Sequence, residues 1–151
     1  MVITFCGHSD FQRMPEYEEK MLAFLEAVVG DEYAEMYLGG YGDFDEFAYY
    51  CCRKYKQAHP NVSLVLVTPY IDAEYRLSQH GETNKYDLIL YPGLESRPLK
   101  FAITYRNRYM VEQSDCVIAF VNRTWGGAYS TYKYAKSKGK KILNIAKTEE
   151  P

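Results

Sequence analysis

The sequence predicts an α/β protein built on a doubly wound, mainly parallel sheet of about six strands with helices on both faces. Short, continuous apolar runs alternate with amphipathic segments along the chain, which is typical of strands that helices bury on both sides. The 151 residues, 47% hydrophobic and 25% charged, have the composition of a globular protein. We therefore expect a single domain over residues 1–151.

Six apolar runs, mostly without polar alternation, are the expected strands. In chain order they are Val2–Cys6, Ala34–Leu38, Val62–Val67, Tyr86–Tyr91, Cys116–Val121 and Lys141–Ile145. Helices are expected between them. The first helix follows Pro15 and ends near Gly30, and its buried stripe comprises Tyr17, Met21, Leu25 and Val28.

The second helix begins at Asp43, which forms a capping-box pattern with Glu46, and one of its faces carries Phe44, Phe47, Cys51 and Tyr55. The third helix is expected over about Leu99–Gln113. The last runs from about Ala128 to Ser137 and stops before Gly139, and its buried stripe comprises Ala128, Thr131, Tyr132 and Ala135. The polar stretch from Tyr70 to Lys85 is expected to hold one helical turn and to be the most mobile part of the chain.

Charge, hydropathy and cysteine spacing limit the function classes. A formal net charge of −2 disfavours a general nucleic-acid binder, although it leaves room for a local basic pocket. The apolar run Cys116–Val121 is too short to span a membrane, and the first residues lack the basic region of an export signal, so a cytoplasmic protein is expected. The four cysteines have no metal-binding spacing, and we expect reduced core thiols and no metal.

Ligands of open parallel sheets bind beyond the carboxyl ends of the strands, so the loops that follow the strands contain the expected site. Two of these loops are glycine-rich and lead directly into helices, which lets backbone N–H groups contact a phosphate or ribose. For either loop alone, the alternative is that its glycines only close a tight turn. The expected ligand-binding residues are Gly7, His8, Ser9, Gly39, Gly40, Tyr41, Asp43, Tyr70, Arg106, Trp125, Gly126, Gly127 and Ser130.

Two arginines on the third helix are expected to differ in role. Arg106 and Arg108 are two residues apart and therefore point to different sides of the helix. Arg108 has Glu112 four residues later, which predicts a surface ion pair. Arg106 lacks such a partner and is the better candidate to reach a phosphate, the alternative being an exposed arginine without a function.

The candidates for catalysis are His8, Asp43 and Glu46. His8 follows a strand and is expected to donate to a phosphate or to act as an acid or base, the alternative being a turn cap. The two carboxylates are equally explained by a capping box, which is the favoured interpretation for Glu46. Trp125 either stacks on a base or packs under its loop. The first loop is not a GxGxxG pattern, so no nicotinamide or flavin cofactor is expected.

Four segments together resemble the SLOG superfamily: GHSDF, LGGYGDFDEFA, RNRYMVEQSDCVIAF and GGAYSTYKYAKSKGKKI. This Rossmann-like superfamily includes the lonely-guy phosphoribohydrolases, the DNA-processing protein DprA and the YpsA-like (DUF1273) proteins, to which the resemblance is closest. It extends over essentially the whole chain and is most specific between Arg106 and Lys141. The resemblance implies a doubly wound sheet whose glycine loops form a nucleotide-type pocket.

The same resemblance argues against one activity. Lonely-guy enzymes place an arginine four residues before a methionine, as Arg106 precedes Met110, and use a glutamate whose place is taken here by Lys133. A lysine cannot stabilise the oxocarbenium-like charge that forms when an N-glycosidic bond breaks. The leading hypothesis is therefore a binding or sensor module for a nucleotide or nucleotide-derived small molecule.

The alternatives are a nucleoside- or nucleotide-processing enzyme of the N-glycosidase, phosphoribohydrolase or deoxyribosyltransferase type and, least favoured, DprA-like binding of single-stranded DNA. The chain has 16 tyrosines. Tyr41, Tyr70, Tyr91 and Tyr129 follow strands or flank the glycine loops, and we expect some of them to line the pocket. A homo-oligomer is a further expectation, because tyrosine-rich surfaces suit interfaces.

Overall fold

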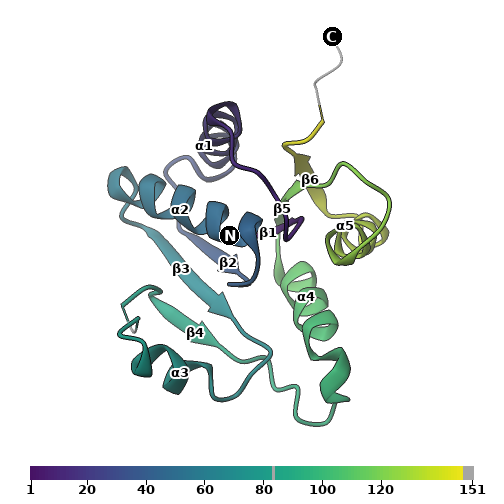
Figure 1. Ribbon diagram of the computed structural model, residues 1–151. Coiled ribbons are helices and arrows are strands. Elements are labelled where there is room, and N and C mark those ends of the chain that lie inside the picture. Colours follow the sequence, from purple (N-terminus) through teal and green to yellow (C-terminus); the bar gives the residue numbers. More distant parts are fainter. Residues whose placement is uncertain (83, 148–151) are drawn as a thin grey trace.

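The computed structural model describes residues 1–82 and 84–147 and confirms the α/β class (Figure 1). Its strands form one parallel sheet of six in the order β4-β3-β2-β1-β5-β6. The strands are β1 (Val2–Gly7), β2 (Ala34–Leu38), β3 (Val62–Val67), β4 (Leu88–Leu90), β5 (Cys116–Phe120) and β6 (Lys141–Asn144). The bounds of β2 and β3 are those predicted, and β1, β5 and β6 differ only at their carboxyl ends.

Helices cover both faces of the sheet. They are α1 (Pro15–Val29), α2 (Asp43–Ala58), α3 (Ala73–Gln79), the 3₁₀ helix η1 (Leu99–Phe101), α4 (Ala102–Gln113) and α5 (Gly127–Ser137). Helices α1 and α2 contact each other on one face of the sheet, and α4 and α5 contact each other on the opposite face (Figure 1). The sheet is therefore the middle of three layers.

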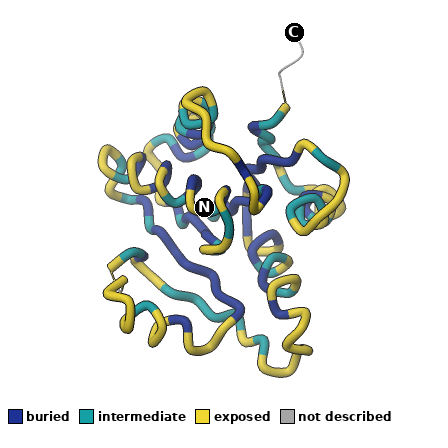
Figure 2. Tube along the Cα trace, in the orientation of Figure 1, coloured by how far each residue is buried: buried dark blue, intermediate teal, exposed yellow. Residues whose placement is uncertain are grey.

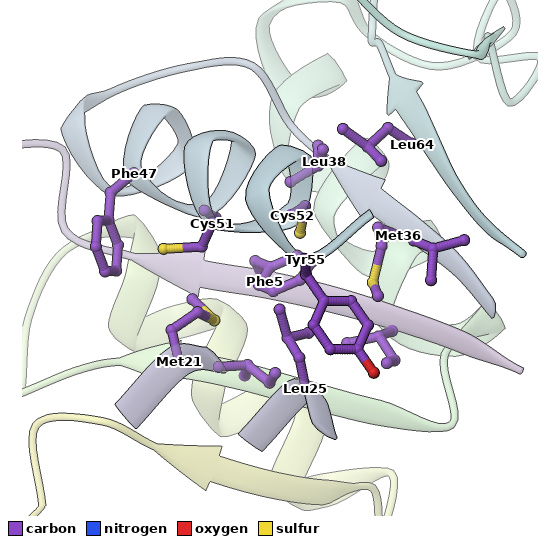
Figure 3. Packing of buried hydrophobic residues seen from close by; sticks show 14 of the residues in the cluster. Phe5, Met21, Leu25, Met36, Leu38, Phe47, Cys51, Cys52, Tyr55 and Leu64 are labelled. Atoms are coloured by element: carbon purple, nitrogen blue, oxygen red, sulfur yellow. The ribbon is translucent and has the colours of Figure 1, made fainter. Parts of the chain in front are cut away.

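The larger core lies between the sheet and the α1–α2 layer. Phe44 and Phe47 of α2 are fully buried there, and the Phe11 ring contacts theirs at centroid distances of 5.3 and 4.9 Å. Cys51 and Tyr55 continue the same buried face of α2, as predicted, and Figure 3 labels both among the buried residues of this cluster. Burial of each large apolar side chain contributes about 1.5–3 kcal/mol to the stability of the fold. The buried face of α2 therefore fixes how this helix is rotated on the sheet.

Two smaller sequence predictions concern α1 and the cysteines. In α1, Met21 and Leu25 are fully buried as expected, but Val29 is buried in place of the predicted Val28, which is only partly buried. All four cysteines are buried free thiols, as predicted. Burial raises the pKa of the Cys51 thiol to about 12, so this thiol is not an activated nucleophile.

The largest difference from the predicted elements lies between β3 and α4. The predicted strand Tyr86–Tyr91 is reduced to Leu88–Leu90, an edge strand that pairs only with β3. The stretch expected to hold one helical turn contains the seven-residue helix α3. Figure 2 shows that this part of the chain is largely exposed, whereas the central strands are buried. An edge strand has one backbone row without a partner, which explains its short length.

The site is positioned by the strand order. Strand β1 lies between β2 and β5, and the helices that follow β1 and β5, namely α1 and α5, pack on opposite faces of the sheet. A crevice forms at such a reversal, outside the carboxyl ends of the strands. Within the part of the chain that the structure describes, no helix has the length and apolar character that a membrane crossing needs.

Candidate functional site

A cleft of about 230 Å³ opens at this crevice, on the α4–α5 side of the sheet. We call it the main cleft. Residues 4–9 of β1 and its loop line one side, and the β2–α2 connection, α4 and the start of α5 complete it. The sequence-predicted position of a site, beyond the carboxyl ends of the strands, therefore coincides with a concave space.

Asp45, in the first turn of α2, is the one carboxylate among the described residues that lines the main cleft. Its Oδ2 accepts a hydrogen bond from the backbone N–H of Tyr41 at 3.0 Å. Burial raises the pKa of Asp45 from 3.8 to about 6, although the Tyr41 N–H and the Arg106 guanidinium both act to lower it. Asp45 can therefore accept hydrogen bonds from ligand hydroxyls when ionised and donate a proton when neutral.

Arg106 of α4 is buried, with 4% of its surface exposed, and joins α4 to the ends of two strands. Its Nη1 donates to the carbonyl oxygens of Gly39 and Val67 at 2.9 and 3.0 Å, and its Nε donates to the Asn107 side chain. A Cβ at Gly39 would lie 2.9 Å from Asp45 Oδ2 and 3.4 Å from Arg106 Cζ, so a larger residue here would require the Asp45 carboxylate to move. The exposed arginine of the alternative interpretation is excluded.

His8 and Arg123 bring buried nitrogen atoms to the opposite end of the main cleft. The backbone N–H of Asn122 donates to His8 Nε2 at 3.2 Å, so the neutral ring carries its hydrogen on Nδ1. Burial, and the nearby Arg123, lower the pKa of His8, which favours this neutral form. Within the described residues, His8 Nδ1 and Arg123 Nε are the buried side-chain atoms that have no hydrogen-bond partner.

The two glycine-led helices present different charges. The first turn of α2 carries Asp43, Asp45 and Glu46, which repel an anion, whereas the first turn of α5 carries no acidic residue. Gly126 precedes α5 with φ of 93°, a conformation that glycine adopts without strain, and nothing lies within 4 Å of where its Cβ would be. The first turn of α5 therefore does not repel an anion as that of α2 does, and the nearby Asp10 is paired with Arg123 at 3.1 Å.

The sequence-predicted ligand residues divide into three groups. Those that line the main cleft are Gly7, His8, Ser9, Gly39, Tyr41, Arg106 and Gly127. Gly40 and Tyr70 line an adjoining pocket of about 140 Å³, which shares Gly39, Tyr41 and Arg106 with the main cleft and which we call the tyrosine pocket. The remaining four, Asp43, Trp125, Gly126 and Ser130, line neither space. Whether the lining residues bind a ligand remains a prediction.

Two local predictions were wrong. Gly42, not Asp43, precedes α2, and no side chain caps that helix, so the capping box of Asp43 and Glu46 does not form. Both carboxylates are exposed and do not line the main cleft, and a catalytic role for either stays a prediction. Arg108 forms no ion pair with Glu112 among the described ion pairs, because its guanidinium lies over the Tyr134 ring and Glu112 accepts from the Tyr134 hydroxyl.

Several lining residues were not predicted. They include Asp45, Asn107 and Arg123. Trp125 is 64% exposed, and the Arg123 guanidinium lies 3.9 Å from its ring centroid, so it neither packs under its loop nor faces the cleft. Across residues 1–82 and 84–147, no group of three His, Cys, Asp or Glu side chains could hold a metal ion.

Comparison with known proteins identifies relatives in sequence and in fold. No protein-family model matches the chain. It is 24% identical over 140 residues to the uncharacterised SPbeta prophage-derived protein YoqJ of Bacillus subtilis (strain 168), with 82% of each chain covered. Similar solved structures include DNA processing protein A from Helicobacter pylori (TM-score 0.58, 18% identity) and DprA from Streptococcus pneumoniae (TM-score 0.60, 18% identity).

The DprA similarities cover 94% and 93% of this chain but only 63% and 48% of those longer chains. The structure of TM1055 is also similar, with a TM-score of 0.54 and 14% identity over 93% of this chain and 71% of that one. The Helicobacter pylori structure is described in terms of single-stranded DNA binding. At these identities the similarity establishes a shared Rossmann-like fold and nothing finer.

Proposed function

We propose that this protein binds a nucleotide or a nucleotide-derived small molecule in the main cleft. The observation that carries the proposal is the pair of buried, unpartnered donors, His8 Nδ1 and Arg123 Nε, on residues that line one end of this cleft. A buried donor without an acceptor costs about 1–3 kcal/mol. An anionic oxygen from a ligand would supply the missing acceptor next to the open start of α5.

The rest of the ligand fits the remaining chemistry of the site. Asp45, at the α2 end, suits ribose hydroxyls, because an ionised carboxylate only accepts hydrogen bonds. The tyrosine pocket suits a base, because Tyr70 and Tyr41 flank it together with Leu66 and Pro69. The phosphate would then lie at the α5 end, away from the acidic first turn of α2.

The proposal is tested by native mass spectrometry of the purified protein and a thermal-shift screen against nucleosides, nucleoside phosphates and dinucleotides. We expect a bound or stabilising nucleotide-type ligand, since a ligand that binds only the folded state raises the melting temperature. Asp45→Asn should weaken binding at least tenfold, whereas Asp43→Asn, an exposed neighbour on the same helix turn, should not. Absence of any such ligand would overturn the proposal.

A second candidate function, turnover of a nucleoside or nucleotide, is supported by the protonation chemistry of Asp45. A carboxyl with a pKa of about 6 in a cleft can act as an acid or base near neutral pH. It would replace Asp43 and Glu46 as the candidate in the enzyme hypothesis. The test is release of free base from a panel of nucleoside monophosphates, with loss of that release in Asp45→Asn and its retention in Glu46→Gln.

The finer expectations from the sequence belong to this proposal as well. They are the YpsA-like assignment within the SLOG superfamily, a cytoplasmic location and a homo-oligomeric state. The matching YoqJ protein is uncharacterised, so it adds no activity to the argument.

A further inference from the structure

The net charge of −2 conceals a strong separation of charge along the chain. Residues 1–75 carry 13 acidic and 5 basic side chains, whereas residues 76–151 carry 7 acidic and 13 basic ones. The acidic residues of α1 and α2 lie on one face of the sheet, and the lysines of α5 lie on the other. The α5 side of the molecule is therefore the place to look for an anion site outside the main cleft.

A pocket of about 320 Å³ lies between the β5–α5 loop, the outer side of α5 and the end of β6. Four cationic side chains line it, namely Arg123, Lys133, Lys136 and Lys147, and we call it the cationic pocket. Among the described residues no carboxylate lines it, and the other polar groups there are amides and hydroxyls such as those of Asn144 and Tyr132. This set of groups is suited to anionic oxygen atoms.

The lysines of the cationic pocket are not used in ion pairs of the described structure. Arg123 pairs with Asp10 at 3.1 Å, but Lys133, Lys136 and Lys147 occur in none of the described ion pairs. The ammonium groups of Lys136 and Lys147 lie 5.2 and 5.6 Å from the Tyr132 ring centroid. Two ammonium groups therefore lie close to the Tyr132 ring, and no carboxylate among the described residues lines this pocket.

The pKa of the Tyr132 hydroxyl reflects the positive charge around this pocket. Lys147 Nζ donates to the Tyr132 hydroxyl at 3.0 Å, and this bond, with the charges of Lys147 and Lys136, lowers the pKa of Tyr132. Lys133, which stands where lonely-guy enzymes are expected to have their glutamate, lies over the Tyr129 ring at 5.5 Å and lines the cationic pocket rather than the main cleft. The substitution therefore adds a cation to this second pocket.

We propose that the cationic pocket binds a diphosphate or triphosphate chain. Arg123 is already paired with Asp10, which leaves the charges of Lys133, Lys136 and Lys147 to be matched. A single phosphate carries at most about two negative charges near neutral pH, whereas a phosphate chain carries enough to match three lysines that are spread across two tyrosine rings. Arg123 lines the main cleft as well as the cationic pocket, so the two spaces adjoin at this residue. The identification of the chain as part of a nucleotide held in the main cleft rests on the proposed function.

The pocket is tested with inorganic tripolyphosphate, which carries the chain without a nucleoside. Isothermal titration at about 50 mM salt, where exposed charges are weakly screened, should detect binding to the 151-residue protein. The double variant Lys133→Ala/Lys136→Ala should weaken it about fivefold for each lysine. The control Lys100→Ala/Lys138→Ala removes the same charge from residues outside the pocket and should change binding less than twofold. Absence of binding, or equal weakening by the two double variants, would overturn the proposal.

Further titrations distinguish the proposal for the cationic pocket from the proposed nucleotide binding in the main cleft, on which it partly rests. Asp45→Asn, in the main cleft, should leave tripolyphosphate binding unchanged and should weaken the binding of nucleoside triphosphates. If lysine-dependent tripolyphosphate binding is found but nucleoside triphosphates bind no more tightly, the main-cleft proposal fails and the cationic pocket stands. If a single-stranded oligonucleotide without terminal phosphates binds more tightly than any triphosphate through the same lysines, a nucleic-acid backbone is the ligand and the phosphate-chain proposal is wrong.

Discussion

The most direct test of the site is a change that should stabilise the fold while it removes function. Asp45→Asn keeps the oxygen that accepts the Tyr41 N–H and removes the carboxylate charge. The pKa of Asp45 is raised from 3.8 to about 6 on folding. A carboxyl with a higher pKa in the folded state opposes folding once it ionises, so the wild-type protein loses stability as the pH rises through this range.

The size of the effect follows from the two pKa values. A difference of about two in pKa corresponds to about 3 kcal/mol when the group is ionised in both states. Between pH 4.5 and 7.5, the stability advantage of Asp45→Asn over the wild type should therefore grow by roughly 2 kcal/mol. Solvent at the mouth of the cleft reduces this figure, so a growth of about 1–2 kcal/mol is expected.

Urea unfolding of both proteins across this pH range measures the effect. Asp43→Asn is the matched control, because Asp43 is exposed in the same helix turn and its charge favours the start of a helix. The control should lose up to about 1 kcal/mol at neutral pH, the opposite sign. If Asp45→Asn is less stable than the wild type at pH 7.5, or if its advantage does not change with pH, the burial argument for Asp45 is refuted.

Further predictions concern the groups that hold the site together. Arg106→Ala should lower the free energy of unfolding by about 2–4 kcal/mol, because it leaves two strand-end carbonyls without their donor and the half-buried Asp45 carboxylate without a nearby cation. Arg108→Ala, on the exposed side of the same helix, should change the free energy of unfolding by less than about 0.5 kcal/mol in urea unfolding. Equal losses in the two variants would contradict the structural role of the Arg106 hydrogen bonds. Phe44→Ala should cost about 3–5 kcal/mol in thermal unfolding, since its ring is fully buried; a loss below about 1 kcal/mol would mean that this ring does not anchor α2. Gly126→Ala should lower the free energy of unfolding by about 1–2 kcal/mol, because φ is 93° at this residue. Gly127→Ala should not lower it. Calorimetric unfolding of the two variants therefore shows whether the loss comes from backbone strain at Gly126 rather than from removal of a flexible glycine.

The sheet was predictable from the sequence because its central strands are buried on both faces. Such strands must be continuous apolar runs, and the runs Ala34–Leu38 and Val62–Val67 match β2 and β3 without error. Strand β4 was overestimated because an edge strand is limited by its single neighbour rather than by its own composition. The position of the site followed from the strands, since it depends on where they end and not on any single side chain.

Asp45, the carboxylate that lines the main cleft, was missed because three acidic residues occur within four positions of the chain. The pattern of Asp43 with Glu46 suggested a capping box, which is a local feature, whereas the orientation of a side chain depends on how the helix is rotated. That rotation could have been read from the periodicity. Asp45 shares a helical stripe with the buried Ala48 and Cys52, while Glu46 shares one with the exposed Tyr50.

The same argument from position refines the inference drawn from net charge. The sum over the whole chain disfavoured a general nucleic-acid binder and left room for a local basic pocket, and the helices on the two faces of this sheet carry opposite net charge. At the cleft, this separation places Asp45 toward α2 and Arg123 toward α5. A ligand with hydroxyl groups at one end and phosphates at the other is therefore oriented by electrostatics before any base contact forms. A reversed orientation would bring phosphate oxygens against the acidic first turn of α2, which the field of the protein opposes.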